Sequence, residues 1–158
     1  VILNPTTDDY YVAELGKGAY KNGSSIQVSP ASDRLGGIVC LSSGYGPEDR
    51  QRTIEVIRRL TGTYALRQLG TTALELCFVA EGLVDAFVCS GDELWDYAAG
   101  IVLVQEAGGK FTDWHGEAWD QDAAFIFGSN GHLHAPLIEV IGDLQPRTLG
   151  TMPAGGIR

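Results

Sequence analysis

The sequence predicts a layered α/β (α+β) fold, in which a mixed sheet is flanked by helices and preceded by a β-hairpin. Two observations carry this prediction. Apolar runs of strand length alternate with helix-length segments from residue 35 onward, and glycines stand at most of the boundaries between them. Such alternation is typical of a sheet covered by helices on both faces. The 158 residues, 44% of them hydrophobic, suffice for one core that needs no disulfide or metal to fold.

The predicted strands are short runs rich in apolar and β-branched residues. They cover residues 10–13, 25–28, 35–41, 63–69, 84–89, 110–113 and 125–128. Residues 1–5 also look like a strand already under way, so we expect them to continue a longer chain. Asn22 and Gly23 lie between the first two strands, and an Asn-Gly pair in that position predicts a tight hairpin turn.

Helices are predicted over residues 47–60, 72–79, 96–107 and 133–141. Pro47 opens the first of them and is followed by two acidic residues, as the helix dipole prefers. Thr72 and Glu75 have the spacing of a capping box at the start of the second helix. That helix is apolar on nearly every face, so we expect it to be buried.

The acidic composition argues against several classes of partner. Eleven basic and twenty acidic side chains give a formal net charge of -9, and such a surface repels nucleic acid backbones. No apolar run approaches the roughly 18 residues that span a bilayer, so no membrane partner is expected. Cys40, Cys77 and Cys89 lack C-x-x-C spacing, which favours free thiols in a reducing, cytoplasmic compartment.

Asp96 is the acidic residue with the clearest candidate role, because it stands at the start of the predicted helix 96–107. Aspartate is a favoured N-cap, whose carboxylate accepts hydrogen bonds from the first free N–H groups of a helix. A carboxylate fixed in this way can also bind Mg²⁺ through its second oxygen. Position alone favours the N-cap role, and both roles can hold at once.

Four segments of the chain resemble the inositol monophosphatase family. The run W-D-x-A-A-G at residues 95–100, followed by E-A-G-G at 106–109, resembles the C-terminal signature of the family. Residues 16–23 resemble its hairpin G-x-G-A-x-x-N-G, residues 70–73 its G-S/T-A-A turn, and residues 130–137 its closing helix. The resemblance runs in order from the first residues to about Leu144.

The resemblance implies the C-terminal half of the sugar-phosphatase fold. Residues 1–30 would be a hairpin belonging to the sheet of a missing N-terminal half, residues 31–144 the C-terminal α/β domain, and residues 145–158 a flexible tail. In the family, the aspartate of the W-D pair binds a catalytic metal ion and contacts the substrate hydroxyl. Asp96 is therefore the implied Mg²⁺ ligand and a substrate contact, and Gly70, Thr71 and Thr72 would hold the alcohol part of the substrate.

Two departures from the family pattern bear on function. The paired-acid motif and D-P-I/L-D-G-T, which supply the other metal ligands and the nucleophile-activating residues, do not occur in the chain. No catalytic residue is therefore assigned within it, and we expect those residues in the missing half. Where members carry a glutamate that contacts the inositol ring, seven residues before Asp96, this chain has Cys89. Cys89 is thus a candidate substrate contact, with Asp92 and Glu93 as alternatives.

Two functional hypotheses remain open at this point. The resemblance implies that the complete protein, expected to be a homodimer, uses Mg²⁺ to hydrolyse a phosphate monoester such as inositol monophosphate or a related sugar phosphate. The 158-residue chain alone would then be inactive. The alternative is a non-catalytic fragment, or a subunit of a split protein that needs a partner chain. Such a subunit would expose apolar surface and an unpaired strand edge.

Overall fold

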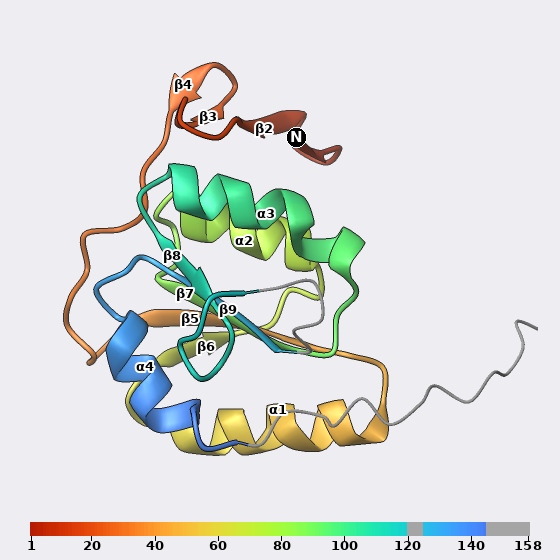
Figure 1. Ribbon diagram of the computed structural model, residues 1–158, viewed down its shortest axis with the longest axis vertical. Coiled ribbons are helices and arrows are strands. Elements are labelled where there is room, and N and C mark those ends of the chain that lie inside the picture. The colour runs from red at the N-terminus through yellow and green to blue at the C-terminus, as the bar shows by residue number, and fades with distance from the viewer. Residues whose placement is uncertain (120–124, 145–158) are drawn as a thin grey trace, which may run out of the picture.

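In the part of the chain that the structure describes, two sheets and four helices are arranged in four layers (Figure 1). The computed structural model describes residues 1–119 and 125–144, so the predicted flexible tail of residues 145–158 lies outside the described residues. In chain order the elements are β1 (Ile2–Asn4), β2 (Asp9–Ala13), β3 (Ala19–Lys21), β4 (Ser24–Ser25), β5 (Ile38–Ser43), α1 (Pro47–Leu60), β6 (Ala65–Arg67), α2 (Thr72–Ala80), β7 (Ala86–Ser90), α3 (Leu94–Glu106), β8 (Lys110–Thr112), β9 (Phe125–Ser129) and α4 (His134–Ile141).

The central layer is a mixed sheet with the strand order β6-β5-β7-β9-β8. Strands β6, β5 and β7 are parallel, whereas β9 is antiparallel to both β7 and β8. Helices α2 and α3 cover one face of this sheet, and α1 and α4 cover the other (Figure 1). The antiparallel sheet β1-β2-β3-β4 lies on the far side of α2 and α3. The predicted layered α/β fold is therefore confirmed. None of the helices in the described ranges is long and apolar enough to cross a membrane.

The first sheet differs from the prediction in one strand. Ala19–Lys21 forms β3, so the Asn22-Gly23 turn joins β3 to β4 and does not join β2 directly to β4. Both turn residues have positive φ, 50° and 81°, a conformation that asparagine and glycine adopt at low cost. Strand β4 is shorter than predicted because the chain then leaves the sheet, and the Val28 N–H donates to the Ala107 carbonyl beyond α3 (3.1 Å).

Helix α2 begins as predicted, but the predicted capping box is wrong. The N-cap is Thr71, whose side chain makes no capping hydrogen bond. Glu75 accepts a hydrogen bond from the Leu69 N–H instead (2.8 Å), and the Thr72 hydroxyl donates to Asp92. Glu75 therefore binds the turn that precedes the helix, and Thr72 binds the loop that carries Asp92. The two residues do not form a capping box.

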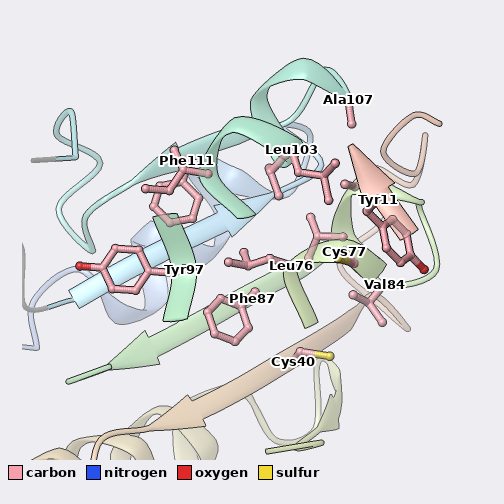
Figure 2. Close-up of a cluster of buried hydrophobic side chains, with 14 of the residues drawn as sticks. Tyr11, Cys40, Leu76, Cys77, Val84, Phe87, Tyr97, Leu103, Ala107 and Phe111 are labelled. Atoms are coloured by element: carbon pink, nitrogen blue, oxygen red, sulfur yellow. The ribbon is translucent and has the colours of Figure 1, made fainter. Parts of the chain in front are cut away.

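Two apolar clusters hold the layers together. The larger cluster lies between the central sheet, helices α2 and α3 and the first sheet, and Figure 2 shows Leu76, Phe87 and Leu103 packed within it. The predicted burial of α2 is confirmed, since Leu76 and Cys77 on this helix are inaccessible to solvent. The second cluster, which includes Leu137 of α4, lies on the other face of the central sheet. All three cysteines are free thiols, as the sequence predicts, and all three are buried.

Two of the segments that carry the family resemblance contact each other. Glu106, the last residue of α3, accepts hydrogen bonds from the N–H groups of Gly16 and Gly18 in the hairpin loop, both at 2.8 Å. These bonds hold the pKa of Glu106 below its usual value. Gly16 and Gly18 have φ of 76° and 85°, and this left-handed backbone allows both N–H groups to reach one carboxylate. The first sheet is thereby fastened to α3.

His134 is buried at the start of α4, with 3% of its surface exposed. Its Nε2 lies 2.9 Å from the Thr112 hydroxyl and its Nδ1 lies 2.8 Å from the Ser129 hydroxyl, while the ring stacks on Phe127. Burial, and to a smaller extent the charge of Lys110, lowers the pKa of His134 to about 4. The imidazole is therefore neutral in the folded protein near pH 7.

We expect this histidine to make the folded protein less stable as the pH falls below about 6.5. The unfolded chain protonates His134 near pH 6.5, whereas the folded protein does so near 4. Its contribution is therefore full above pH 6.5 and declines as the pH falls toward 4, by up to about 3 kcal/mol. Urea unfolding between pH 7 and 4 should show a smaller loss of stability for His134→Asn than for the wild type. The exposed His132→Asn serves as the control. Equal pH slopes for His134→Asn and wild type would contradict this account.

Candidate active site

An open cavity of about 430 Å³ lies at one edge of the central sheet. The parallel strands β5, β6 and β7 place their C-terminal ends at this edge, next to the first turns of α2 and α3. In α/β proteins such an edge commonly binds small molecules. The cavity is lined by Ser42, Ser43, Tyr45, Gln68, Gly70, Thr71, Thr72, Ala73, Asp92, Trp95 and Asp96.

Four of the site residues expected from the sequence line this one cavity. Gly70 and Thr71 come from the turn between β6 and α2, Thr72 is the first residue of α2, and Asp96 comes from the first turn of α3. The packing of α2 against α3 brings these two segments together, although they are distant in the sequence. Contact between these residues and a bound molecule stays a prediction.

The turn before α2 is shaped by Gly70 and Glu75. Gly70 has a φ of 76°, and a Cβ at this position would meet no atom within 4 Å, so backbone conformation and not lack of space favours glycine here. Glu75 is fully buried and accepts the Leu69 N–H at 2.8 Å. Burial raises the pKa of Glu75, although bonds from the backbone of Leu69 and Gly70 oppose the rise. The start of α2 is thus held in place with its free N–H groups beside the cavity.

Asp96 is the third residue of α3, and the prediction that it is the N-cap is wrong. The helix begins at Leu94, and Glu93 is its N-cap. The Asp96 Oδ2 accepts a hydrogen bond from the Glu93 N–H at 3.2 Å, and the two residues form a capping box. The preference of aspartate for the N-cap position placed the predicted helix start too late. The side chain of Asp96 stays exposed at the cavity.

Asp92 is held in the cavity by side chains from two other elements. It follows β7, and its carboxylate accepts a hydrogen bond from the Thr72 hydroxyl on α2. Its other oxygen lies 3.5 Å from the Ser42 hydroxyl on β5. Asp92 is partly buried in this position. The loop between β7 and α3 is therefore linked to both neighbouring elements at the site.

Cys89, the remaining candidate from the sequence, lies on β7 and is fully buried. Burial, and then the nearby charge of Asp92, raises the pKa of its thiol well above the usual value. Of the three alternatives at this end of β7, only Asp92 lines the cavity, whereas Cys89 and Glu93 do not. Contact between Cys89 and a substrate stays a prediction, and the geometry favours Asp92 for that role.

Sequence reasoning missed part of the cavity wall. The missed residues are Ser42, Ser43, Tyr45, Gln68, Ala73 and Trp95. Tyr45 and Trp95 are its large aromatic members, with 90% and 79% of their surfaces exposed. Ser42 and Ser43 could have been found from their place at the end of a predicted strand, because the C-terminal ends of parallel strands meet at one edge. No single motif in the sequence, however, indicates which strands pair with each other in the sheet.

The loops beside the cavity are backed by Asp49, which lies in the first turn of α1 and is 1% exposed. A Cβ placed on Gly44, Gly46 or Gly91 would come within 2.8 Å of an atom of the Asp49 side chain. Gly91 also has a φ of 89°. The close approach of Asp49 therefore leaves no room for a side chain at these three glycines, the last of which begins the loop that carries Asp92.

The described part of the chain does not by itself make a metal site of the kind that Mg²⁺ needs. Asp92 and Asp96 are the acidic residues that line the cavity. Within residues 1–119 and 125–144, no group of three or more histidine, cysteine or acidic side chains is arranged to hold a metal ion. Mg²⁺ prefers several oxygen ligands in octahedral geometry, and the described residues bring only these two carboxylates to the cavity.

The structure is that of an α/β protein with a cavity that is rich in hydroxyl groups and bears two carboxylates. The model of the inositol monophosphatase family matches residues 1–145, and the chain belongs to this family. It is 33% identical over 143 residues to an inositol-1-monophosphatase of Rhizobium meliloti. It is 36% identical over 146 residues to a fructose-1,6-bisphosphatase/inositol-1-monophosphatase of Thermotoga maritima. The solved inositol monophosphatase from Anabaena is also similar, with a TM-score of 0.85 at 30% identity.

The chain spans about half the length of the curated relatives that it matches. The R. meliloti comparison covers 89% of this chain and 54% of the relative, and the T. maritima comparison covers 91% and 55%. The Anabaena structure is matched over 93% of this chain and 62% of its own.

Proposed function

We propose that the complete protein hydrolyses a phosphate monoester, inositol monophosphate or a related sugar phosphate, and that it depends on Mg²⁺. Within it, this chain would supply one metal ligand, Asp96, and the contacts to the alcohol part of the substrate. One observation carries the proposal, namely that Asp96 shares a cavity with Gly70, Thr71 and Thr72 in a chain of the inositol monophosphatase family. Relatives named as inositol monophosphatases support the class of reaction.

The residues of this chain bind and orient; they do not activate water. The hydroxyl of Thr71 and the free N–H groups at the start of α2 offer donors to the oxygens of a bound alcohol or phosphate. The Thr72 hydroxyl donates to Asp92, so it can only accept a hydrogen bond from a substrate hydroxyl. Asp96 is fixed through one oxygen by the Glu93 N–H. It would be one ligand of a Mg²⁺ ion, which when bound stabilises the developing negative charge of the ester. The other ligands and the group that activates water would come from outside this chain.

Metal removal tests this proposal in the complete protein. We expect phosphate release from inositol 1-phosphate in millimolar Mg²⁺, loss of that activity after treatment with a chelator, and recovery when Mg²⁺ is returned. Turnover that survives exhaustive chelation would exclude the metal-dependent class. Zn²⁺ added in place of Mg²⁺ is a useful control, because it prefers nitrogen and sulfur ligands in tetrahedral geometry.

A second candidate is a subunit of a split protein that functions with a partner chain, or a non-catalytic fragment. The observation that favours it is the uncovered face of the first sheet. Leu3 and Tyr10 form a cross-strand pair on that face, with 58% and 46% of their surfaces exposed, and Tyr20 is 39% exposed. Strand β1 is also an edge of its sheet in the described part of the chain. Apolar surface beside an open edge is typical of an interface.

Intact-mass analysis of the purified protein discriminates between these candidates. A second chain of about a hundred residues that carries D-P-x-D-G-T would support the split protein, and one longer chain would support the continuous enzyme. The 158-residue species alone would favour the isolated fragment. For the complete protein we also propose a homodimer and a cytoplasmic location. The buried, unpaired cysteines are compatible with a reducing compartment.

A further inference from the structure

Asp92 lines the candidate active site, and hydrogen bonds orient its side chain. One carboxylate oxygen accepts the Thr72 hydroxyl, and the other lies 3.5 Å from the Ser42 hydroxyl. Gly91, immediately before it, is held against the buried Asp49. The Asp92 carboxylate is therefore oriented by side chains of two elements, β5 and the first turn of α2.

The other candidate side chains near Asp92 cannot act in the cavity in its place. Cys89 is buried behind the loop, and Glu93 is the N-cap of α3 and does not line the cavity. Glu75 is fully buried and is engaged with the Leu69 N–H. Of the carboxylates in the described part of the chain, Asp92 and Asp96 are the two that line the cavity, and only Asp92 is bonded there to side-chain hydroxyls.

We propose that Asp92 is the specificity-determining residue of this site and selects substrates whose leaving group carries several hydroxyls. A carboxylate has about four lone-pair positions, so bonds from Thr72 and Ser42 leave positions that can accept one or two hydroxyls of a bound polyol. Such charge-assisted bonds are stronger than bonds between neutral groups. A leaving group without hydroxyls would form no such hydrogen bond with Asp92, and the charged carboxylate would then lack a substrate partner. The inference rests on the proposed function, because it concerns the same cavity.

The test compares Asp92→Asn with Glu93→Gln in the complete protein. Asparagine keeps the size of the side chain and one acceptor oxygen but removes the charge. Glu93→Gln makes the same change of charge one residue away, outside the cavity. The quantity measured is the ratio of kcat/KM for inositol 1-phosphate to kcat/KM for para-nitrophenyl phosphate, whose leaving group has no additional hydroxyl.

We expect Asp92→Asn to lower this ratio roughly ten- to a hundredfold, as the loss of one charge-assisted hydrogen bond predicts. Glu93→Gln should leave the ratio close to that of the wild type. An unchanged ratio in Asp92→Asn, or an equal fall in Glu93→Gln, would overturn the assignment. Circular dichroism of both variants checks that they are folded.

A binding measurement separates failure of this inference from failure of the proposed function. If the wild-type protein hydrolyses neither ester, the proposed function is wrong. In that case free myo-inositol is titrated into the 158-residue chain and followed by amide NMR. Shifts at Thr72 and Asp92 that are lost in Asp92→Asn would support polyol recognition by Asp92. No shift in the wild-type chain at tens of millimolar polyol would overturn it.

Discussion

Replacing Asp96 with asparagine should reduce phosphatase activity in the complete protein by roughly a hundredfold or more while leaving the fold intact. The asparagine oxygen can still accept the Glu93 N–H, so the capping box at the start of α3 is kept. The negative charge that would bind Mg²⁺ is lost, together with an interaction that matters most in the transition state. The measurement is kcat/KM for inositol 1-phosphate beside the Tm of each protein.

Asp113→Asn is the matched control for this change. Asp113 also accepts backbone N–H groups, from His115 and Glu117, but it lies in the loop after β8 and does not line the cavity. Near wild-type activity in Asp96→Asn would show that Asp96 only caps its helix. A Tm lower by more than about 5 °C would mean that the capping role and the metal role cannot be separated in this way.

Gly91→Ala should be strongly destabilising. The left-handed φ of 89° costs an alanine roughly 1–2 kcal/mol. The new methyl group would also lie 2.6 Å from the Asp49 carboxyl carbon, and relieving that overlap in a buried place costs roughly another 1–3 kcal/mol. Because Gly91 begins the loop that carries Asp92, the cavity should also be distorted. Urea unfolding of the 158-residue chain measures the change in the free energy of unfolding.

Gly62→Ala separates the two causes. Gly62 follows α1 with a φ of 95°, and a Cβ there would meet no atom within 4 Å, so this variant carries the backbone cost alone. The difference between the two variants is therefore the contribution of the Asp49 contact. If Gly62→Ala and Gly91→Ala were equally destabilising, the close approach of Asp49 would have no energetic consequence.

The layers of this fold are predictable from local pattern, whereas several boundaries are not. Alternating apolar runs identify the central sheet and its helices, because each element must bury one face. Strand β3 escapes prediction because Ala19–Lys21 is too short for a repeating pattern, and only its pairing with β2 defines it. The start of α3 is misplaced because Asp96 has the chemistry of an N-cap, yet Glu93 begins the helix.

Some residues of the candidate site can likewise be predicted from the sequence, and others cannot. Gly70 and Asp96 can be found because they belong to motifs that resemble a family. Asp92 could be named only as one alternative to Cys89, because the sequence does not say which side chain at the end of β7 turns toward the cavity. The structure distinguishes them by burial and by the bond from Thr72. Ser42 joins the site through the pairing of β5 with β7, a contact between distant parts of the chain.

The most direct test of the central claim is phosphate release by the pure 158-residue chain, measured beside the complete protein. The claim is that this chain forms the alcohol-binding side of a phosphatase site and lacks most of its metal ligands. Both proteins are assayed with inositol 1-phosphate at millimolar Mg²⁺. We predict turnover by the complete protein and no release above background by the chain alone. Clear, Mg²⁺-dependent turnover by the pure chain would contradict the account.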